Sequence, residues 1–134
     1  MSFSPRVIAF CCDNSAYLAA DMAGTMKLSY PEEIEIVRIP CSGRVDALHI
    51  LKAFENGADG VLIAACYENA CRYIRGNIRA KNRVDYIRSI LRDVGIEEER
   101  VQIAYLAPNM GVKFAQIASE IVERVKEIGP AIPL

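Results

Sequence analysis

Four short runs of apolar and β-branched residues recur along the chain, and each is followed by a segment long enough to form a helix. The runs occupy residues 6–12, 33–40, 60–66 and 101–107. Strands that alternate with helical crossovers predict a parallel sheet covered by helices on both faces. Because such crossovers are right-handed, few topologies remain. We expect an α/β fold of flavodoxin-like or Rossmann-like type, with a single open sheet of about four strands in the order 2-1-3-4.

The segments between these runs carry apolar residues at helical spacing. The first helix is expected to begin after a cap at Asn14 or Ser15 and to stop near Tyr30. The second is expected over 45–56, closed by Gly57. Its predicted inner side is formed by Val45, Leu48, Leu51 and Phe54.

The second half of the chain is expected to contain two more helices. Residues 67–82 are polar and predict mostly loop with some helix. An amphipathic helix follows, with Val84, Ile87, Leu91 and Val94 on its apolar stripe and Gly95 at its end. The last helix is predicted over 112–128, ended by Gly129.

A chain of 134 residues predicts one domain, here residues 1–134. No apolar stretch approaches the ~20 residues that a membrane span needs, and the N-terminus lacks the apolar region of a signal peptide. We therefore expect a cytoplasmic protein whose cysteines stay reduced, where clustered thiols favour metal or redox chemistry.

Cysteines follow three of the predicted strands at the point where each strand ends. Cys12 and Cys66 end the first and third runs, Cys41 directly follows the second, and Cys71 lies five residues beyond Cys66. In an open parallel sheet of order 2-1-3-4, these positions share the carboxyl edge, where such folds bind ligands. Four thiolates favour an iron–sulfur cluster. Cys11 is expected to point away from Cys12 and to be a core residue.

Two other interpretations of these cysteines stay open. Four cysteines are compatible with structural zinc, although such sites usually support domains that lack a core. Cys66 through Arg72 also spells the C-x5-R pattern of a cysteine-dependent phosphatase. Its loop, however, contains no glycine and carries Glu68, which would repel a phosphate.

Charge is unevenly spread along the chain. Residues 72–92 carry seven basic residues against the single acid Asp85, although the whole chain has a net charge of −1. This asymmetry predicts either a docking surface for an acidic partner or a solvated helix face. No nucleic-acid recognition motif accompanies it. The single histidine, His49, is expected on a polar helix face, in solvent.

Several strings resemble the delta subunit of methyl-viologen-reducing hydrogenase, which is also called the D-type iron–sulfur subunit of F420-non-reducing hydrogenase. The resemblance covers nearly the whole chain, and its most specific part is Pro-Cys-Ser-Gly-Arg-Val-Asp at 40–46. The strings that carry it lie at 12–24, 40–46, 53–62 and 66–77.

The resemblance implies a non-catalytic electron-transfer protein of anaerobic metabolism with one [2Fe–2S] cluster, held by Cys12, Cys41, Cys66 and Cys71. It implies two partners: an oxidoreductase module such as a hydrogenase or formate dehydrogenase, and the flavin-containing A-type subunit of a heterodisulfide-reductase-type complex. The competing expectation is a docking adaptor that has lost its cluster and only bridges these subunits. No nucleic acid or membrane is expected as a partner.

The chain departs from the family pattern at two places. The family commonly has Cys-x-x-Cys at the end of the first strand, and here Ser15 stands at the second position. The family loop after Cys66 usually reads His-Pro-Gly-Asp, and here residues 67–70 read Tyr-Glu-Asn-Ala. The four remaining cysteines still suffice for a cluster.

Overall fold

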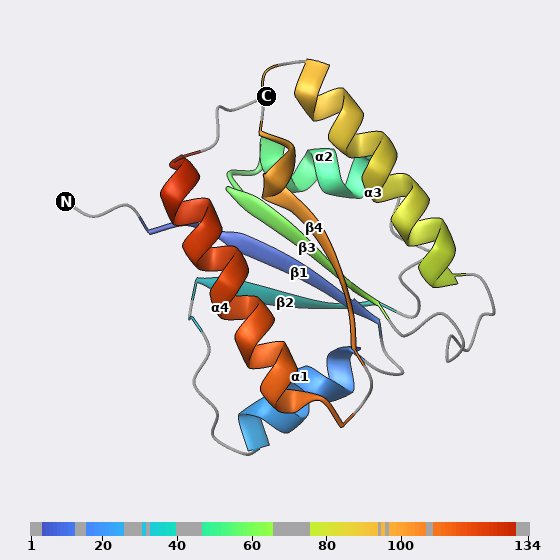
Figure 1. The fold of residues 1–134 in the computed structure, drawn as a ribbon, viewed down its shortest axis with the longest axis vertical. Helices are drawn as coiled ribbons and strands as arrows, with labels where there is room; N and C mark the ends of the chain where they lie inside the picture. The colour runs from blue at the N-terminus through green and yellow to red at the C-terminus, as the bar shows by residue number, and fades with distance from the viewer. Residues whose placement is uncertain are drawn as a thin grey trace.

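The fold is an open parallel sheet with two helices on each face (Figure 1). It is given by a computed structural model, which describes residues 4–12, 16–25, 31, 33–39, 47–65, 76–93, 95, 97–106 and 109–130. The strands are β1 (Val7–Cys12), β2 (Ile34–Ile39), β3 (Gly60–Ala65) and β4 (Val101–Tyr105). Their order is β2-β1-β3-β4, so the predicted fold class and strand order are confirmed.

The helices are α1 (Ala16–Thr25), α2 (Ala47–Glu55), α3 (Gly76–Asp93) and α4 (Gly111–Ile128), and a 3-10 turn, η3 (Glu98–Arg100), leads into β4. Glycines with positive φ follow α2, α3 and α4, at Gly57, Gly95 and Gly129. All three are the helix ends that the sequence predicts, because glycine adopts this conformation without the steric cost of a Cβ atom.

The core is divided by the sheet into two layers. One cluster joins α1 and α4 to Val7, Ala9 and Cys11 of β1. The other joins α2 and α3 to Ile8 of β1 and to Val61 and Ile63 of β3. Side chains alternate between these layers along β1, as the pleat of a strand requires. All six residues of β3 are buried, as its wholly apolar sequence predicts.

Two helical predictions were wrong in detail. In α2, Leu48 is 70% exposed, whereas Ile50, Ala53 and Phe54 face the core. The helix carries two overlapping apolar stripes, and packing on the sheet selects the second one. Residues 76–82, predicted as mostly loop, form the first turns of α3. Their polar sequence is held in a helix that continues into the buried residues Val84, Ile87 and Leu91.

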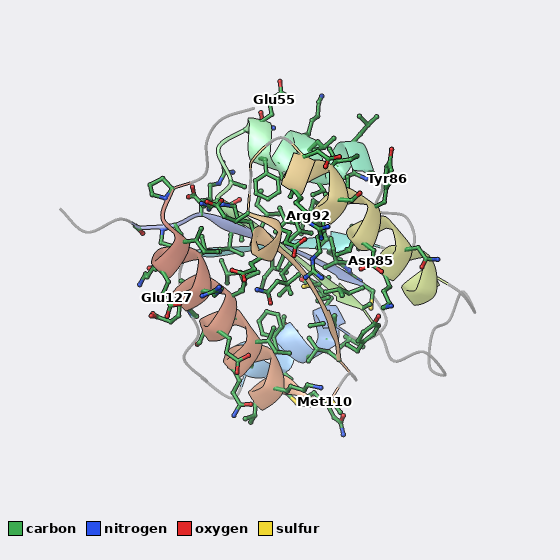
Figure 2. The ribbon with its side chains drawn as sticks, turned by 45° about the horizontal axis from the view of Figure 1, so that its top comes forward. Glu55, Asp85, Tyr86, Arg92, Met110 and Glu127 are labelled. Carbon is green, nitrogen blue, oxygen red and sulfur yellow. The ribbon has the colours of Figure 1, made fainter. Side chains whose placement is uncertain are left out.

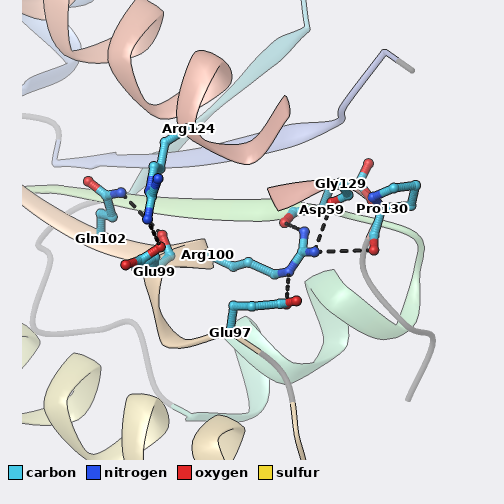
Figure 3. Close-up of polar contacts among 8 residues, drawn as sticks. All are labelled: Asp59, Glu97, Glu99, Arg100, Gln102, Arg124, Gly129 and Pro130. Carbon is cyan, nitrogen blue, oxygen red and sulfur yellow. Dashed lines mark hydrogen bonds and ion pairs between the residues drawn. The ribbon is translucent and has the colours of Figure 1, made fainter. Parts of the chain in front are cut away.

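A buried arginine, Arg100, links the segments at the amino-terminal ends of β3 and β4, here called the amino edge of the sheet (Figure 3). Arg100 is 1% exposed, and its guanidinium donates to Glu97, to the Asp59 carbonyl and to the carbonyls of Gly129 and Pro130. The segment after α4 is thereby tied to the starts of β3 and β4. The carboxyl edge lies at the opposite end of the strands.

Candidate functional site

The described part of the site is built around Cys12, the last residue of β1. Its side chain is 3% exposed, and the backbone N–H of Ala16 donates to its sulfur over 3.4 Å. Ala16 is the first residue of α1, so the sulfur lies at the positive end of a helix, where negative charge is stabilised. Backbone donors of this kind tune the potential of cysteine-ligated iron–sulfur clusters.

The strand register places the ends of β1, β2 and β3 at the same edge of the sheet. Cys12 pairs with Ile39, the last residue of β2, and Cys11 pairs with Ala64, one residue before the end of β3. Three strands therefore end at one level. Cys66 directly follows the end of β3, and Cys41 follows the end of β2 by two residues. Cys41, Cys66 and Cys71 themselves lie outside the described residues, as do Ser15 and the C-x5-R segment.

Cys11 differs from Cys12 in its surroundings. It is fully buried, and its thiol points toward the Ala9 carbonyl with a sulfur–oxygen distance of 3.9 Å. Burial raises the pKa of the Cys11 thiol to about 12, and the neighbouring Cys12 adds to this rise. The structure thus places Cys11 in the core as a protonated thiol. Contrary to the predicted alternation, Cys12 packs in the same cluster, at the point where the chain leaves the strand for α1.

A cation–π pair joins β2 to α1 on one side of β1. The guanidinium of Arg38 stacks over the ring of Tyr17, 4.8 Å from its centroid. Arg38 pairs in register with Cys11, and Tyr17 follows Ala16 in α1. The sequence contained no signal for this stack, because a cation and a ring 21 positions apart meet only when β2 and α1 are assembled.

The described cations of the basic segment contact other parts of the same molecule. Arg88 donates to the Val101 carbonyl of β4, Arg92 pairs with Glu98, and Lys81 pairs with Asp85. Figure 2 shows Asp85, Tyr86 and Arg92 along α3. These three cations therefore attach α3 to β4 and η3 or pair within the helix. The side chains of Arg72, Arg75, Arg79 and Arg83 lie outside the described part of the chain, so the predicted docking surface stays a prediction.

The remaining sequence expectations concern metal ligands and membranes. His49 is exposed on α2, as predicted for a solvated histidine. Among the described residues, no group of three or more histidine, cysteine or acidic side chains is positioned to hold a metal ion. Three of the four expected cysteines are outside those residues. None of the described helices is long and apolar enough to cross a membrane.

Comparison with known proteins assigns the chain to a family. Residues 7–129 match the family model of the methyl-viologen-reducing hydrogenase delta subunit. The chain belongs to this family. It is 42% identical to the D-type iron–sulfur subunit of an F420-non-reducing hydrogenase from Methanopyrus kandleri, over 97% of this chain and 98% of the relative. It is 38% identical to the corresponding protein of Archaeoglobus profundus, over 96% of this chain and 93% of the relative.

A second kind of relative is much longer than this chain. The A-type subunit of the ferredoxin:CoB-CoM heterodisulfide reductase of Methanosarcina mazei is 36% identical over 94% of this chain, but the match spans 16% of that protein. In that organism, a segment related to nearly the whole of this chain is therefore part of the longer reductase polypeptide. The family resemblance inferred from the sequence is confirmed by the family model and by the full-length relatives.

Proposed function

We propose that this chain is an electron-transfer subunit with one [2Fe–2S] cluster, held by Cys12, Cys41, Cys66 and Cys71. It relays electrons between an oxidoreductase module, such as a hydrogenase or formate dehydrogenase, and the flavin-containing A-type subunit of a heterodisulfide-reductase-type complex. The chain itself catalyses no substrate conversion.

One observation carries the proposal. The register brings Cys12 level with the ends of the two strands that lead into Cys41 and Cys66. The chemistry of the described ligand also fits the group, because the buried sulfur of Cys12 accepts an N–H from the start of α1. When bound, the cluster would accept and release one electron. The protein holds its sulfur ligand in place, orients a hydrogen-bond donor toward it and shields it from water.

The names of the relatives support the cofactor class and the partner. Two full-length relatives are named as iron–sulfur subunits of a hydrogenase. The longer relative carries its related segment within the A-type subunit of a heterodisulfide reductase. Segments that are fused in one organism and separate in another commonly act on each other, since fusion replaces association by a high effective concentration.

The test begins with anaerobically purified and reconstituted protein. We expect about two iron and about two acid-labile sulfide per chain, with a binuclear EPR signal after dithionite reduction. Replacing Cys12, Cys41, Cys66 or Cys71 singly by serine should lower the iron content. Cys11→Ser is the matched control, because Cys11 is a buried core thiol, and it should keep its iron.

The partner is tested separately from the cluster. The chain should co-elute in size-exclusion chromatography with the A-type subunit of a heterodisulfide reductase from the same organism. An iron-free wild-type protein that still co-elutes would refute the electron relay and leave the cluster-free docking adaptor. Zinc without iron would refute the cluster in favour of a structural metal.

A further inference from the structure

The backbone of Arg38 in β2 lies close to the end of β1, where Cys12 is the last residue. In β2, its neighbour Ile39 is the register partner of Cys12. Adjacent strands of a sheet are about 4.8 Å apart, so the residue before this pair is also close to the end of β1. Arg38 itself pairs with Cys11. Arg38 is thus the residue that directly precedes the register partner of Cys12.

The ring of Tyr17 holds the charged end of Arg38 against the start of α1. The ring of Tyr17 lies 4.8 Å from the guanidinium carbon. Tyr17 directly follows Ala16, whose N–H lies 3.4 Å from the Cys12 sulfur. The guanidinium is therefore held against the second residue of α1, the helix whose first residue donates to the sulfur, and it comes from the strand residue that precedes the register partner of Cys12.

A positive charge fixed at this position has a defined electrostatic effect. Reduction adds one negative charge to an iron–sulfur cluster, and a nearby cation stabilises the reduced form more than the oxidised form. Arginine keeps its charge over the whole physiological pH range, and stacking on an aromatic ring limits its motion. Because Arg38 is exposed, part of its field is screened by water and salt.

We propose that Arg38, held on the ring of Tyr17, is a positioning residue that raises the reduction potential of the group bound at Cys12. This inference rests on the proposed function, since it needs a redox group at that edge. The charge acts through space on the bound group, and the ring of Tyr17 holds the charge against the start of α1.

The test is a spectroelectrochemical titration of reconstituted protein, with midpoint potential and iron content measured for each variant. R38Q should lower the ratio of reduced to oxidised cluster at a given applied potential by up to about tenfold. This corresponds to a fall of ~59 mV in the midpoint potential of a one-electron couple. R38K should remain closer to the wild type, because it keeps the charge. The midpoint potential of Y17L should also fall, but by less, because the charge of Arg38 remains and only loses the ring that holds it.

A matched control removes the same charge elsewhere. Arg124 pairs with Glu99 and Glu127, next to η3 and the amino edge of the sheet. R124Q should leave the midpoint potential unchanged. The shift of R38Q should also shrink when the salt concentration is raised, as for any solvent-exposed charge.

Each outcome bears on the proposal. A midpoint potential of R38Q equal to that of the wild type, or an equal shift in R124Q, would overturn the role of Arg38 and leave the electron-relay function standing. If R38Q retains too little iron to titrate, an unchanged potential in Y17L overturns it. A wild-type protein without iron after reconstitution would overturn both proposals together.

Discussion

Removing the buried guanidinium of Arg100 tests how the amino edge of the sheet is held together. Its Nε donates to Glu97 over 2.8 Å, and its two terminal nitrogens donate to the carbonyls of Asp59, Gly129 and Pro130 over 2.8–3.1 Å. No other described charged or polar side chain is as buried as this one. Arg100→Met keeps an apolar stem of similar length but removes every donor, so four acceptors lose their partner.

The magnitude follows from the exposure of those acceptors. Breaking a buried charged contact costs roughly 3–5 kcal/mol when the partners stay dry. Here Glu97 is 50% exposed, and water can reach the carbonyls at the end of α4. The lower end of the range applies, so we expect R100M to lower the free energy of unfolding by about 3 kcal/mol. That is a large share of the ~5–15 kcal/mol typical of a domain.

Urea unfolding followed by circular dichroism at about pH 7 measures this loss through the transition midpoint at constant slope. R92M is the matched control, because Arg92 is a surface arginine with a single exposed partner, Glu98. It should unfold as the wild type does. A loss below about 1 kcal/mol in R100M would refute the reasoning, because the four acceptors would then be satisfied equally well by water.

The stability that R100M loses should also depend on pH. The hydrogen bond from Arg100 holds the pKa of Glu97 below its ordinary value of 4.5. A carboxyl whose pKa is lower in the folded than in the unfolded state stabilises the fold above its unfolded pKa, and this contribution is lost as pH falls through the folded pKa. The stability difference between wild type and R100M should therefore narrow below about pH 4.5. An unchanged difference down to about pH 2 would contradict this linkage.

The remaining predictions concern packing and thiol reactivity. A Cβ atom at Gly60 would lie 2.8 Å from a methyl group of α4, so G60A should lower the free energy of unfolding by about 1–3 kcal/mol. In the control G24A, the added Cβ atom meets nothing within 4 Å, and the free energy of unfolding should rise by about 0.5–1 kcal/mol. Urea unfolding measures both changes. In the C12S background, Cys11 should resist iodoacetamide in the native state below about pH 10 and react after unfolding, and rapid native labelling seen by mass spectrometry would contradict its burial. Leu48→Ser should leave the urea midpoint nearly unchanged, and Ile50→Ser should lower the free energy of unfolding by more than about 2 kcal/mol; equal effects would show that the face of α2 is assigned wrongly.

Short-range sequence patterns and chain connectivity were sufficient for the architecture, and they also predict a location for the site. The runs that became β1, β2, β3 and β4 are short and rich in apolar or β-branched residues, and chain connectivity with helical crossovers leaves few strand orders. The carboxyl ends of parallel strands meet at one edge, so Cys12, Cys41 and Cys66 could be assigned to that edge from the sequence. Their ligand role remains a prediction, tested first by iron content.

What the sequence by itself determined is therefore the set of elements, their order and the ends of three helices, because each depends on neighbouring residues or on chain connectivity. Only the tertiary structure decided which of two apolar stripes of α2 is buried. It also stacked Arg38 on Tyr17 and buried the side chain of Arg100 against the segment that follows α4. These outcomes depend on contacts between residues far apart along the chain. A guanidinium can remain in solvent or bind distant acceptors, and only the assembled sheet and helices fix which of the two occurs.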